Sequence, residues 1–362
     1  MHLPSHGANP LRLYESLGMK VPEKIIDFSE NVNPVGPPAS VRENWSHYFK
    51  LLSAYPDPTG EPFLSKVAAF HKVETNKIVL GNGASELFAV LARRYTGKRV
   101  IVVHPTFSEY EATLEAAKAE IVSVVVDDIG SWQLPIACLK QEMIDASALY
   151  LCTPNNPTGV LPSRTVLDEL IAYGGTVDCE IILDEAFIDW VDEKLSFIPL
   201  IQENPHVIVV RSMTKLYAIP GIRLGYLVAD EVICQNLKQQ MPHWHINGLA
   251  AVIGAECLDS WEYAQEAVRI ARLGREKIRK ILDGYGCLVS DSVTNYMAFH
   301  LPKGHDAHTF FMFCLARGVV LRHSQNFKGM NGQWFRIGVK EDTAIAFLHV
   351  VLAEWFEKEG RK

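Results

Sequence analysis

The sequence predicts an α/β fold with a mostly parallel sheet between helices, followed by a smaller α+β domain. Short runs of Val, Ile and Leu alternate with helical apolar spacing through the middle of the chain, and this alternation stops in the last hundred residues. Continuous apolar strands separated by helices are typical of a parallel sheet covered on both faces. A chain of 362 residues is also long enough for about two domains.

The first strand of the predicted sheet is Lys77–Leu80, and helical spacing follows over Ala84–Tyr95. Further apolar runs predict strands at Arg99–Val103, Ile121–Val126, Ala148–Cys152, Cys179–Leu183 and Val207–Val210. Helices are predicted between some of them, at Glu109–Ala119 and Ser163–Tyr173. Sheets of this kind bind ligands beyond the carboxyl ends of their strands.

The last hundred residues follow a different pattern. Helices are predicted at Trp261–Tyr285, Ala307–Arg317 and Thr343–Lys358, and strands at Tyr296–His300, Val319–Arg322 and Trp334–Val339. The first forty residues, rich in Pro, Gly and Asn, indicate an arm rather than a core. We therefore expect an arm over residues 1–40 that packs with the small domain and the active site, a large domain over 41–255 and a small domain over 256–362.

Composition and charge exclude several classes of protein. The formal charge of −7 disfavours non-specific binding to nucleic acid or an anionic membrane. The seven cysteines are scattered without a C-x-x-C pair, as expected of reduced thiols in a cytoplasmic protein. The first residues lack the pattern of a signal peptide, and no apolar run is long enough for a membrane span. His243 and His245 lack an evident third ligand, so no metal is expected.

The turn after the first strand could bind a phosphate. Gly81-Asn82-Gly83-Ala84-Ser85 joins that strand to a helix. Glycines let the backbone approach a phosphate, and a helix start offers N–H groups and the positive end of its dipole. The segment is neither a Walker loop nor a dinucleotide fingerprint, and taken alone it could be a simple turn.

Three later strand ends also carry polar residues. Thr153–Gly159 could be only a proline-fixed turn, although it contains Asn156. Asp184 follows the next strand and could hold Mg²⁺ in a nucleotide triphosphatase, but the matching phosphate loop is absent. Ser212, Lys215 and Arg223 follow the strand Val207–Val210.

An amine, a carboxylate, an amide and phosphate-binding groups are thus expected to converge where four strands end. Pyridoxal phosphate (PLP) needs this set. A lysine binds its aldehyde covalently, an aspartate keeps its pyridine nitrogen protonated, and donors hold its phosphate and phenolate oxygen. The sequence therefore predicts a PLP site.

The motifs Asn156-Pro157-Thr158-Gly159, Asp184-Glu185-Ala186 and Ser212-x-x-Lys215 with Arg223 resemble those of fold-type I PLP enzymes, the superfamily of class I and II aminotransferases. The resemblance covers essentially the whole chain. It implies a large domain with a mostly parallel seven-stranded sheet, and a homodimer with shared active sites.

Within this superfamily the chain resembles the branch of histidinol-phosphate aminotransferases and threonine-phosphate decarboxylases. Three features favour the decarboxylases: His6-Gly7-Ala8-Asn9, which resembles His-Gly-Gly-Asn; the segments Asp27–Pro34 and Ser212–Leu227; and Phe187, where most of the aminotransferases have Tyr. Ala8 departs from the family's second glycine.

This resemblance implies decarboxylation of O-phospho-L-threonine to (R)-1-amino-2-propanol phosphate for the nucleotide loop of cobalamin. A histidinol-phosphate-type aminotransferase is the alternative, and a non-catalytic PLP-binding protein is a third hypothesis. Whichever Cα bond stands perpendicular to the cofactor ring is weakened, and the shared motifs do not decide which bond this is.

The resemblance also implies roles for single residues. Lys215 would bind the cofactor and carry a proton, and Asp184 would pair with the pyridine nitrogen. The other cofactor-binding residues would be Ala84, Ser85, Phe107, Asn156, Phe187, Ser212, Arg223 and, from the neighbouring subunit, Tyr55. The substrate would be surrounded by His6, Gly7, Asn31, Asn156, Arg322 and Arg336.

Some of these residues also have a purely structural interpretation. Phe107 and Phe187 could be ordinary core aromatics. Arg322 and Arg336 each interrupt an apolar strand, where a buried cation needs a partner. An anionic ligand or a structural salt bridge could supply it, and we favour the ligand.

Overall fold

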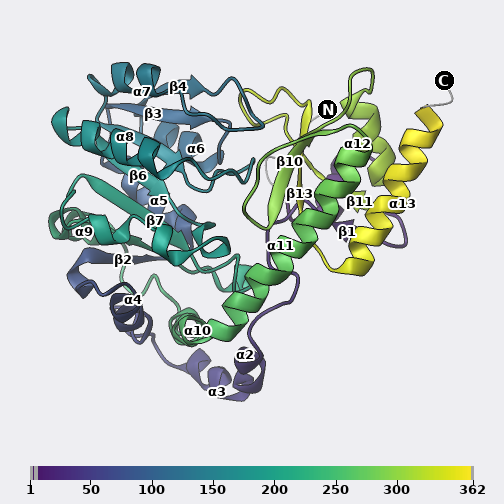
Figure 1. Cartoon of the computed structure of the whole chain (residues 1–362). Helices are drawn as coiled ribbons and strands as arrows, with labels where there is room; N and C mark the ends of the chain where they lie inside the picture. Colours follow the sequence, from purple (N-terminus) through teal and green to yellow (C-terminus); the bar gives the residue numbers. More distant parts are fainter. Residues whose placement is uncertain (1–2, 4–6, 360–362) are drawn as a thin grey trace.

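The computed structural model describes residue 3 and residues 7–359, which form a larger and a smaller part side by side (Figure 1). The larger part holds a seven-stranded sheet. Its strands are β2 (Ile78–Gly81), β3 (Arg99–His104), β4 (Glu120–Val125), β5 (Ala148–Cys152), β6 (Glu180–Asp184), β7 (Val207–Ser212) and β8 (Gly225–Val228). They lie in the order β2-β8-β7-β6-β5-β3-β4, and only β8 runs antiparallel to its neighbours. The predicted α/β class and mostly parallel sheet are confirmed.

Helices cover both faces of this sheet because its strands are apolar on both sides. Along β7, Val207 and Val209 pack into one core, and Ile208 and Val210 into the core of the opposite face. The first core includes residues of α4 (Phe63–His71), α7 (Ile136–Met143), α8 (Arg164–Thr176) and α10 (Gly248–Asp259). The second includes residues of α5 (Ala84–Arg93), α6 (Glu109–Ala116) and α9 (Glu231–Lys238).

The smaller part is built on an antiparallel sheet of four strands in the order β12-β13-β10-β9. Its elements are the long helix α11 (Trp261–Gly284), β9 (Leu288–Val289), β10 (Tyr296–His300), α12 (Ala307–Ala316), β11 (Val319–Val320), β12 (Arg322–His323), β13 (Trp334–Gly338) and α13 (Asp342–Glu359). Its own core is rich in aromatic residues, among them Phe299, Phe310 and Phe335.

The single strand predicted over Val319–Arg322 is wrong. Val319 and Val320 pair in parallel with β1 (Ile26–Asp27), whereas Arg322 and His323 pair with β13. The chain therefore passes from one small sheet to another at Leu321, and this change pairs Arg322 with Arg336 of β13.

The amino-terminal segment supplies core residues, contrary to the expectation of an arm rather than a core. Tyr14, on α1 (Pro10–Ser16), and Phe28, just after β1, are fully buried with the aromatic core of the smaller part. Tyr14 also donates a hydrogen bond of 2.7 Å to the carbonyl of Leu315. The segment is therefore fixed to the smaller part by packing and by strand pairing.

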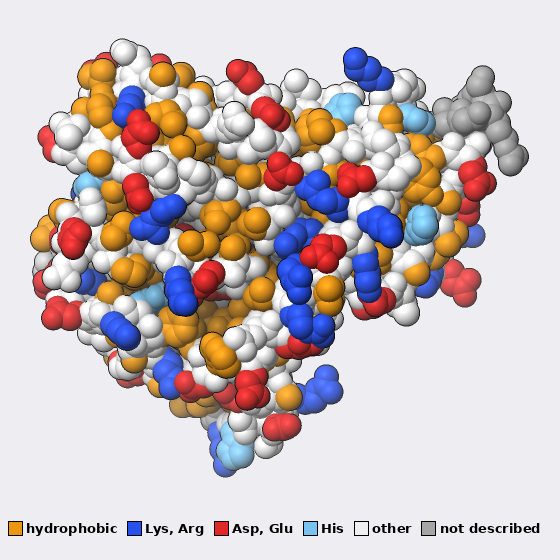
Figure 2. Space-filling model, in the orientation of Figure 1, with side chains coloured by type: hydrophobic (Ala, Val, Ile, Leu, Met, Phe, Trp, Pro, Cys, Tyr) orange, Lys and Arg blue, Asp and Glu red, His pale blue; other side chains and the backbone are white. Residues whose placement is uncertain are grey.

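The remaining elements are short. They are α2 (Ala39–Glu43), α3 (Trp45–Phe49) and the 3₁₀ helices η1 (Lys50–Ser53), η2 (Thr75–Lys77), η3 (Ile188–Trp190), η4 (Glu193–Leu195), η5 (Ile198–Leu200) and η6 (Pro220–Ile222). Across the described residues, no helix has the length and apolar character needed to span a bilayer. On the face shown in Figure 2, basic side chains gather in a stripe over α11, with acidic side chains beside them.

Candidate active site

A cavity lies at the carboxyl ends of the central strands, where parallel sheets bind ligands. It brings together these predicted residues: Ala84, Ser85, Phe107, Asn156, Asp184, Phe187, Ser212, Lys215 and Arg223. The structure adds Phe88, Thr214 and Ala186, which the sequence analysis did not single out. Thr214 and Ala186 stand next to Lys215 and Phe187, so the motifs themselves could have suggested them.

Lys215 has the environment of a nucleophilic amine. Its Nζ donates a hydrogen bond of 2.8 Å to Thr214 Oγ1, which lies 2.8 Å from Ser212 Oγ. Burial lowers the pKa of Lys215 to about 8, and the nearby charges of Arg223 and Arg336 act in the same direction against that of Asp184. A larger fraction of the amine is therefore neutral near pH 7 than for an exposed lysine.

Asp184 is held by two hydrogen bonds at the end of β6. Tyr110 Oη donates to Oδ2, and the Ala186 N–H donates to Oδ1 at 2.9 Å. Burial raises the pKa of this carboxyl, and both donors and Lys215 oppose the rise. Tyr110 was not predicted, although it lies one helical turn after Phe107, whose ring it contacts.

Gly83, Ser212 and Arg223 lie together at the start of α5, in a cradle that could hold a phosphate. Gly83 has a φ of +83°, and a Cβ there would lie 2.5 Å from Arg223 Nη2. The glycine therefore lets the guanidinium approach the turn. The N–H groups of Ala84 and Ser85, the first two residues of α5, add to the donors there, because the first N–H groups of a helix have no acceptor within it.

Gly225 closes the same cradle from β8. A Cβ at Gly225 would lie 2.8 Å from the Arg211 carbonyl oxygen and 2.9 Å from the Ala84 nitrogen. The donors, the amine of Lys215 and the buried carboxylate of Asp184 together fit PLP.

Arg322 and Arg336 face each other across two antiparallel strands, as register partners of β12 and β13. Arg336 donates to Asn156 Oδ1 at 2.7 Å and to the Ser29 carbonyl at 2.6 Å. Arg322 donates to Asn326 Oδ1 at 2.7 Å and to the His323 carbonyl at 3.0 Å. The sequence analysis did not identify Asn326 or Ser29 as partners, because neither contact follows from the sequence pattern.

Burial opposes the charge on both arginines. It lowers the pKa of Arg322 to about 9, with a further contribution from the neighbouring Arg336 cation, and that of Arg336 to about 10. Arg336 Nε and Asn31 Oδ1 are both buried and have no hydrogen-bond partner among the described residues. The open Arg336 Nε–H and the two cations suit an anionic ligand, whereas Asn31 Oδ1 can only accept a hydrogen bond.

The amino-terminal segment reaches the same region. Gly7 lines a small cavity with Ser29, Arg322 and His323, and a Cβ at Gly7 would lie 2.6 Å from the Ser29 carbonyl oxygen. Ala8 has a φ of +63° and donates its N–H to Ser29 Oγ at 3.0 Å. Residue 8, where this chain has alanine in place of the family's second glycine, therefore has a left-handed backbone conformation. His6 lies outside the described residues.

Tyr55 does not line this cavity in its own chain. Its side chain is 84% exposed, and its ring lies 5.2 Å from that of Trp244. Its role toward a neighbouring subunit stays a prediction. Among the described residues, no group of three His, Cys, Asp or Glu side chains is placed to hold a metal ion.

Residues 23–347 match the family model described as "Aminotransferase class I and II". The chain belongs to this family. It is 33% identical to the threonine-phosphate decarboxylase of Salmonella typhimurium over 339 residues, which are 93% of this chain and 92% of the relative.

Solved structures agree with this assignment. The histidinol-phosphate aminotransferase of Clostridium acetobutylicum superposes with a TM-score of 0.87 and 25% identity, covering 92% of this chain and 100% of the other. That of Sinorhizobium meliloti, in complex with pyridoxal-5'-phosphate, shares the fold with a TM-score of 0.84 at 21% identity, covering 98% and 96%.

Family membership makes this chain a PLP-dependent enzyme. The predicted family, fold class and cofactor are thus confirmed.

Proposed function

We propose that this enzyme decarboxylates O-phospho-L-threonine to (R)-1-amino-2-propanol phosphate and CO₂, in cobalamin biosynthesis. The relative from Salmonella typhimurium, which matches over nearly the whole chain, supports the reaction. The pair Arg322 and Arg336 supports the choice of a phosphorylated substrate, and it is the observation that carries the proposal.

An anion would stabilise the arginine pair. Like charges directly opposite on neighbouring strands destabilise a sheet, and both side chains are buried. A phosphate ester with an α-carboxylate brings several negative charges. Planar guanidinium groups bind either of these anions through two oxygens at once.

The cofactor would be held at the strand ends. Lys215 would bind it covalently, Asp184 would face its pyridine nitrogen, and Asn156 its phenolate oxygen. Phe107 and Phe187 would contact the ring, while Ala84, Ser85, Ser212 and Arg223 would hold its phosphate. When bound, PLP withdraws electrons from the substrate Cα.

The orientation of the substrate decides which Cα bond breaks. Arg322 and Arg336 would fix the phosphate and the carboxylate, with Gly7, Asn31 and His6 completing this part of the site. Loss of CO₂ leaves an electron pair at Cα that must take up one proton. Lys215, with a pKa of about 8, is suited to hold that proton and deliver it.

A histidinol-phosphate-type aminotransferase is the second candidate. The structure with a TM-score of 0.87 and 25% identity is of that kind. Such an enzyme would remove the Cα proton instead of CO₂ and would need an amino acceptor such as 2-oxoglutarate.

One incubation distinguishes the two functions. The holoenzyme is given phosphothreonine, with and without 2-oxoglutarate, and CO₂ and keto-acid product are measured together. We expect CO₂ in equal amounts under both conditions and no keto acid. Glutamate formed from 2-oxoglutarate, with phosphothreonine or in a parallel incubation with histidinol phosphate, would establish the aminotransferase instead.

We also infer a cytoplasmic homodimer. The cysteines are all free, and most are buried, which supports a reducing compartment. The segment around α3 and η1 exposes Trp45, Phe49, Leu52 and Tyr55, and Trp244 lies beside Tyr55. Large apolar side chains gathered on a surface favour a protein interface.

A further inference from the structure

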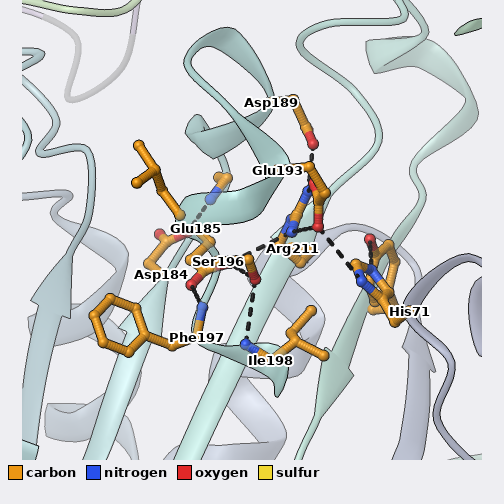
Figure 3. A network of polar contacts seen from close by, with 12 residues as sticks. His71, Asp184, Glu185, Asp189, Glu193, Ser196, Phe197, Ile198 and Arg211 are labelled. Atoms are coloured by element: carbon orange, nitrogen blue, oxygen red, sulfur yellow. Dashed lines mark hydrogen bonds and ion pairs between the residues drawn. The ribbon is translucent and has the colours of Figure 1, made fainter. Parts of the chain in front are cut away.

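A buried ionic cluster lies behind the cofactor site. The proposed function gives it no role, although one member, Glu185, stands in the motif Asp184-Glu185-Ala186. We call it the Arg211 network; it consists of Arg211, Glu185, Asp189, Glu193 and His71 (Figure 3). Arg211 Nη1 lies 3.4 Å from Glu185 Oε2, and Nη2 donates to Glu193 Oε2 at 2.7 Å and to Asp189 Oδ1. The side chains of Arg211 and Glu185 are 2% and 0% exposed.

Strand geometry places this network back to back with the site. Successive side chains of a strand point to opposite faces. In the register of β6 and β7, Asp184 lies opposite Val210, so the next residues, Glu185 and Arg211, lie together on the other face. Asp184 and Ser212 point to the cofactor cavity, whereas their chain neighbours Glu185 and Arg211 point into the network.

The network also fixes the segment that follows β6. Glu185 accepts hydrogen bonds from Ser196 Oγ at 2.6 Å and from the Phe197 N–H at 2.7 Å. Asp189 and Glu193, on η3 and η4, bind the same guanidinium, and His71 reaches Glu193 from α4. The segment that starts with Ala186 and Phe187 is therefore tied down on both sides of those cavity residues.

Stability alone is a weak reason for such a cluster. Replacing buried ion pairs by apolar residues of similar size is often neutral or stabilising, whereas removing one member leaves buried charges without compensation. Burial already raises the pKa of Glu185 to about 7 with Arg211 beside it. The planar guanidinium of an arginine can bind two carboxylates at once. Its contribution here is therefore to fix the position of two strands relative to each other rather than to stabilise the fold.

We propose that Arg211 and Glu185 are positioning residues for the cofactor, because they lock together the strand ends that carry Ser212 and Asp184. The inference rests on the proposed roles of Asp184 and Ser212. Without the lock, the carboxylate of Asp184 and the hydroxyl of Ser212 no longer keep a fixed separation, and the pyridine nitrogen and the phosphate of PLP are no longer held at once.

The test compares Arg211→Met with Arg94→Met. Arg94 pairs with a glutamate at the opposite end of the same sheet, where its Nε donates to Glu180 Oε2 at 2.9 Å, and its side chain is 28% exposed. Each holoenzyme is examined for its melting temperature, its rate of PLP loss on dialysis and the ³¹P chemical shift of the bound cofactor phosphate. The last two report on the cofactor and not on global stability.

Both variants should melt at lower temperature than the parent protein. Only Arg211→Met should lose PLP faster than the parent protein. We expect the rate to rise about 10-fold or more, as affinity falls when a residue that holds a metal ligand in place is replaced. Only this variant should also shift the ³¹P signal. Equal losses of stability with unchanged PLP release and ³¹P shift in both would overturn the inference.

Two further variants keep the test decisive if Arg211→Met does not fold. Arg211→Lys retains the charge without the fork, and Glu193→Gln changes a partner that is 37% exposed. Either should accelerate PLP loss, and unchanged release in both would overturn the proposal. Asp184→Asn serves as the reference. If it leaves PLP release unchanged, the site assignment itself fails, and the inference fails with it.

Discussion

Burial lowers the pKa of three cations in the site, Lys215, Arg322 and Arg336. It raises the pKa of the acid Asp184. Burial thus favours the neutral form of each group. For Lys215 this is useful, because the neutral amine is the nucleophile. For the arginines it is a cost, which an anionic ligand would offset.

Replacing either arginine by lysine tests this point. Arg322→Lys and Arg336→Lys should each lower kcat/KM for phosphothreonine, because a point ammonium cannot bind two oxygens in one plane. The fall should correspond to a loss of ~2 to 4 kcal/mol of transition-state stabilisation. Steady-state kinetics of CO₂ release measure the loss. Threonine itself should react at least ~10²-fold more slowly than its phosphate ester in the parent enzyme.

Arg275→Lys is the matched control. Arg275 is half-buried in the smaller part, whereas Arg322 and Arg336 are buried. It donates to the carbonyl of Thr294, which does not line either cavity. Its replacement should change kcat/KM less than twofold. Equal rates on threonine and phosphothreonine would refute the phosphate-ester substrate even if the PLP chemistry is present.

The residues at strand ends could be predicted from the sequence, and their partners could not. Asn156, Asp184 and Lys215 follow apolar runs, and the geometry of parallel sheets brings such ends together. Tyr110 reaches Asp184 from α6, and Asn326 reaches Arg322 from a loop. These contacts depend on how a helix and a loop pack, which leaves no periodic trace in one sequence.

The second prediction concerns the turn between β2 and α5. Gly83→Ala places a Cβ 2.5 Å from Arg223 Nη2 and forces alanine into the left-handed region. The strain should cost ~1 to 2 kcal/mol of folding free energy. Displacement of Arg223 should also speed PLP loss at least ~10-fold, since a charge-assisted contact is worth ~1.5 to 3 kcal/mol. Denaturation curves and dialysis of the holoenzyme measure the two effects.

Gly97→Ala separates these contributions. Gly97 has a φ of +71°, but a Cβ there meets nothing within 4 Å. It should lose similar stability and retain PLP like the parent protein. If Gly83→Ala retains PLP equally well, the turn does not shape the phosphate site.

The predicted strand bounds were wrong where a strand pairs with a distant part of the chain. Ala148–Cys152 and Tyr296–His300 have the predicted bounds, and Cys179–Leu183 is shifted by one residue in β6. Val319–Arg322 looked continuous because all of its first residues are apolar. Its division depends on Ile26 and Asp27, which pair with Val319 and Val320 from the other end of the chain.

His71, the last residue of α4, should make stability depend on pH. Burial, together with the Arg211 cation, lowers its pKa from 6.5 to about 3. Between these values the unfolded chain binds a proton that the folded chain does not, so stability is lost as the pH falls from 6.5 toward 3. Relative to His71→Gln, the parent protein should lose up to ~1.4 kcal/mol more per pH unit in this range.

Urea denaturation at several pH values measures this difference. Above pH 7 both forms of His71 are neutral, and the two proteins should differ by a constant amount. Parallel curves down to pH 4 would show that His71 takes up its proton in the folded state, against the neutral form expected from its burial.

The two parts of the molecule contribute different halves of the site. The seven-stranded sheet carries the residues that fit the cofactor, whereas the smaller part and the amino-terminal segment carry those that suit the substrate's anions. Arg336 joins the halves through its hydrogen bond to Asn156. Tyr55, which is 84% exposed in its own chain, fits this arrangement only if a second copy supplies it.

Hybrid dimers test that requirement directly. Tyr55→Phe protein should bind PLP more weakly, because it lacks the phenol that would reach the neighbour's cofactor phosphate. Lys215→Ala protein should be inactive and should lack the absorption band of the covalently bound cofactor. In a mixed dimer of a two-fold enzyme, one site combines Lys215 of one chain with Tyr55 of the other and is unmodified.

Mixing the two variants should therefore restore tight PLP binding and full turnover at one site in each hybrid. Titration of PLP against CO₂ release measures both. Sedimentation at nanomolar concentration gives the assembly state. If each variant keeps its own properties after exchange of subunits, or if a monomer is fully active, Tyr55 serves no neighbouring site, and its exposed ring with that of Trp244 must have another role.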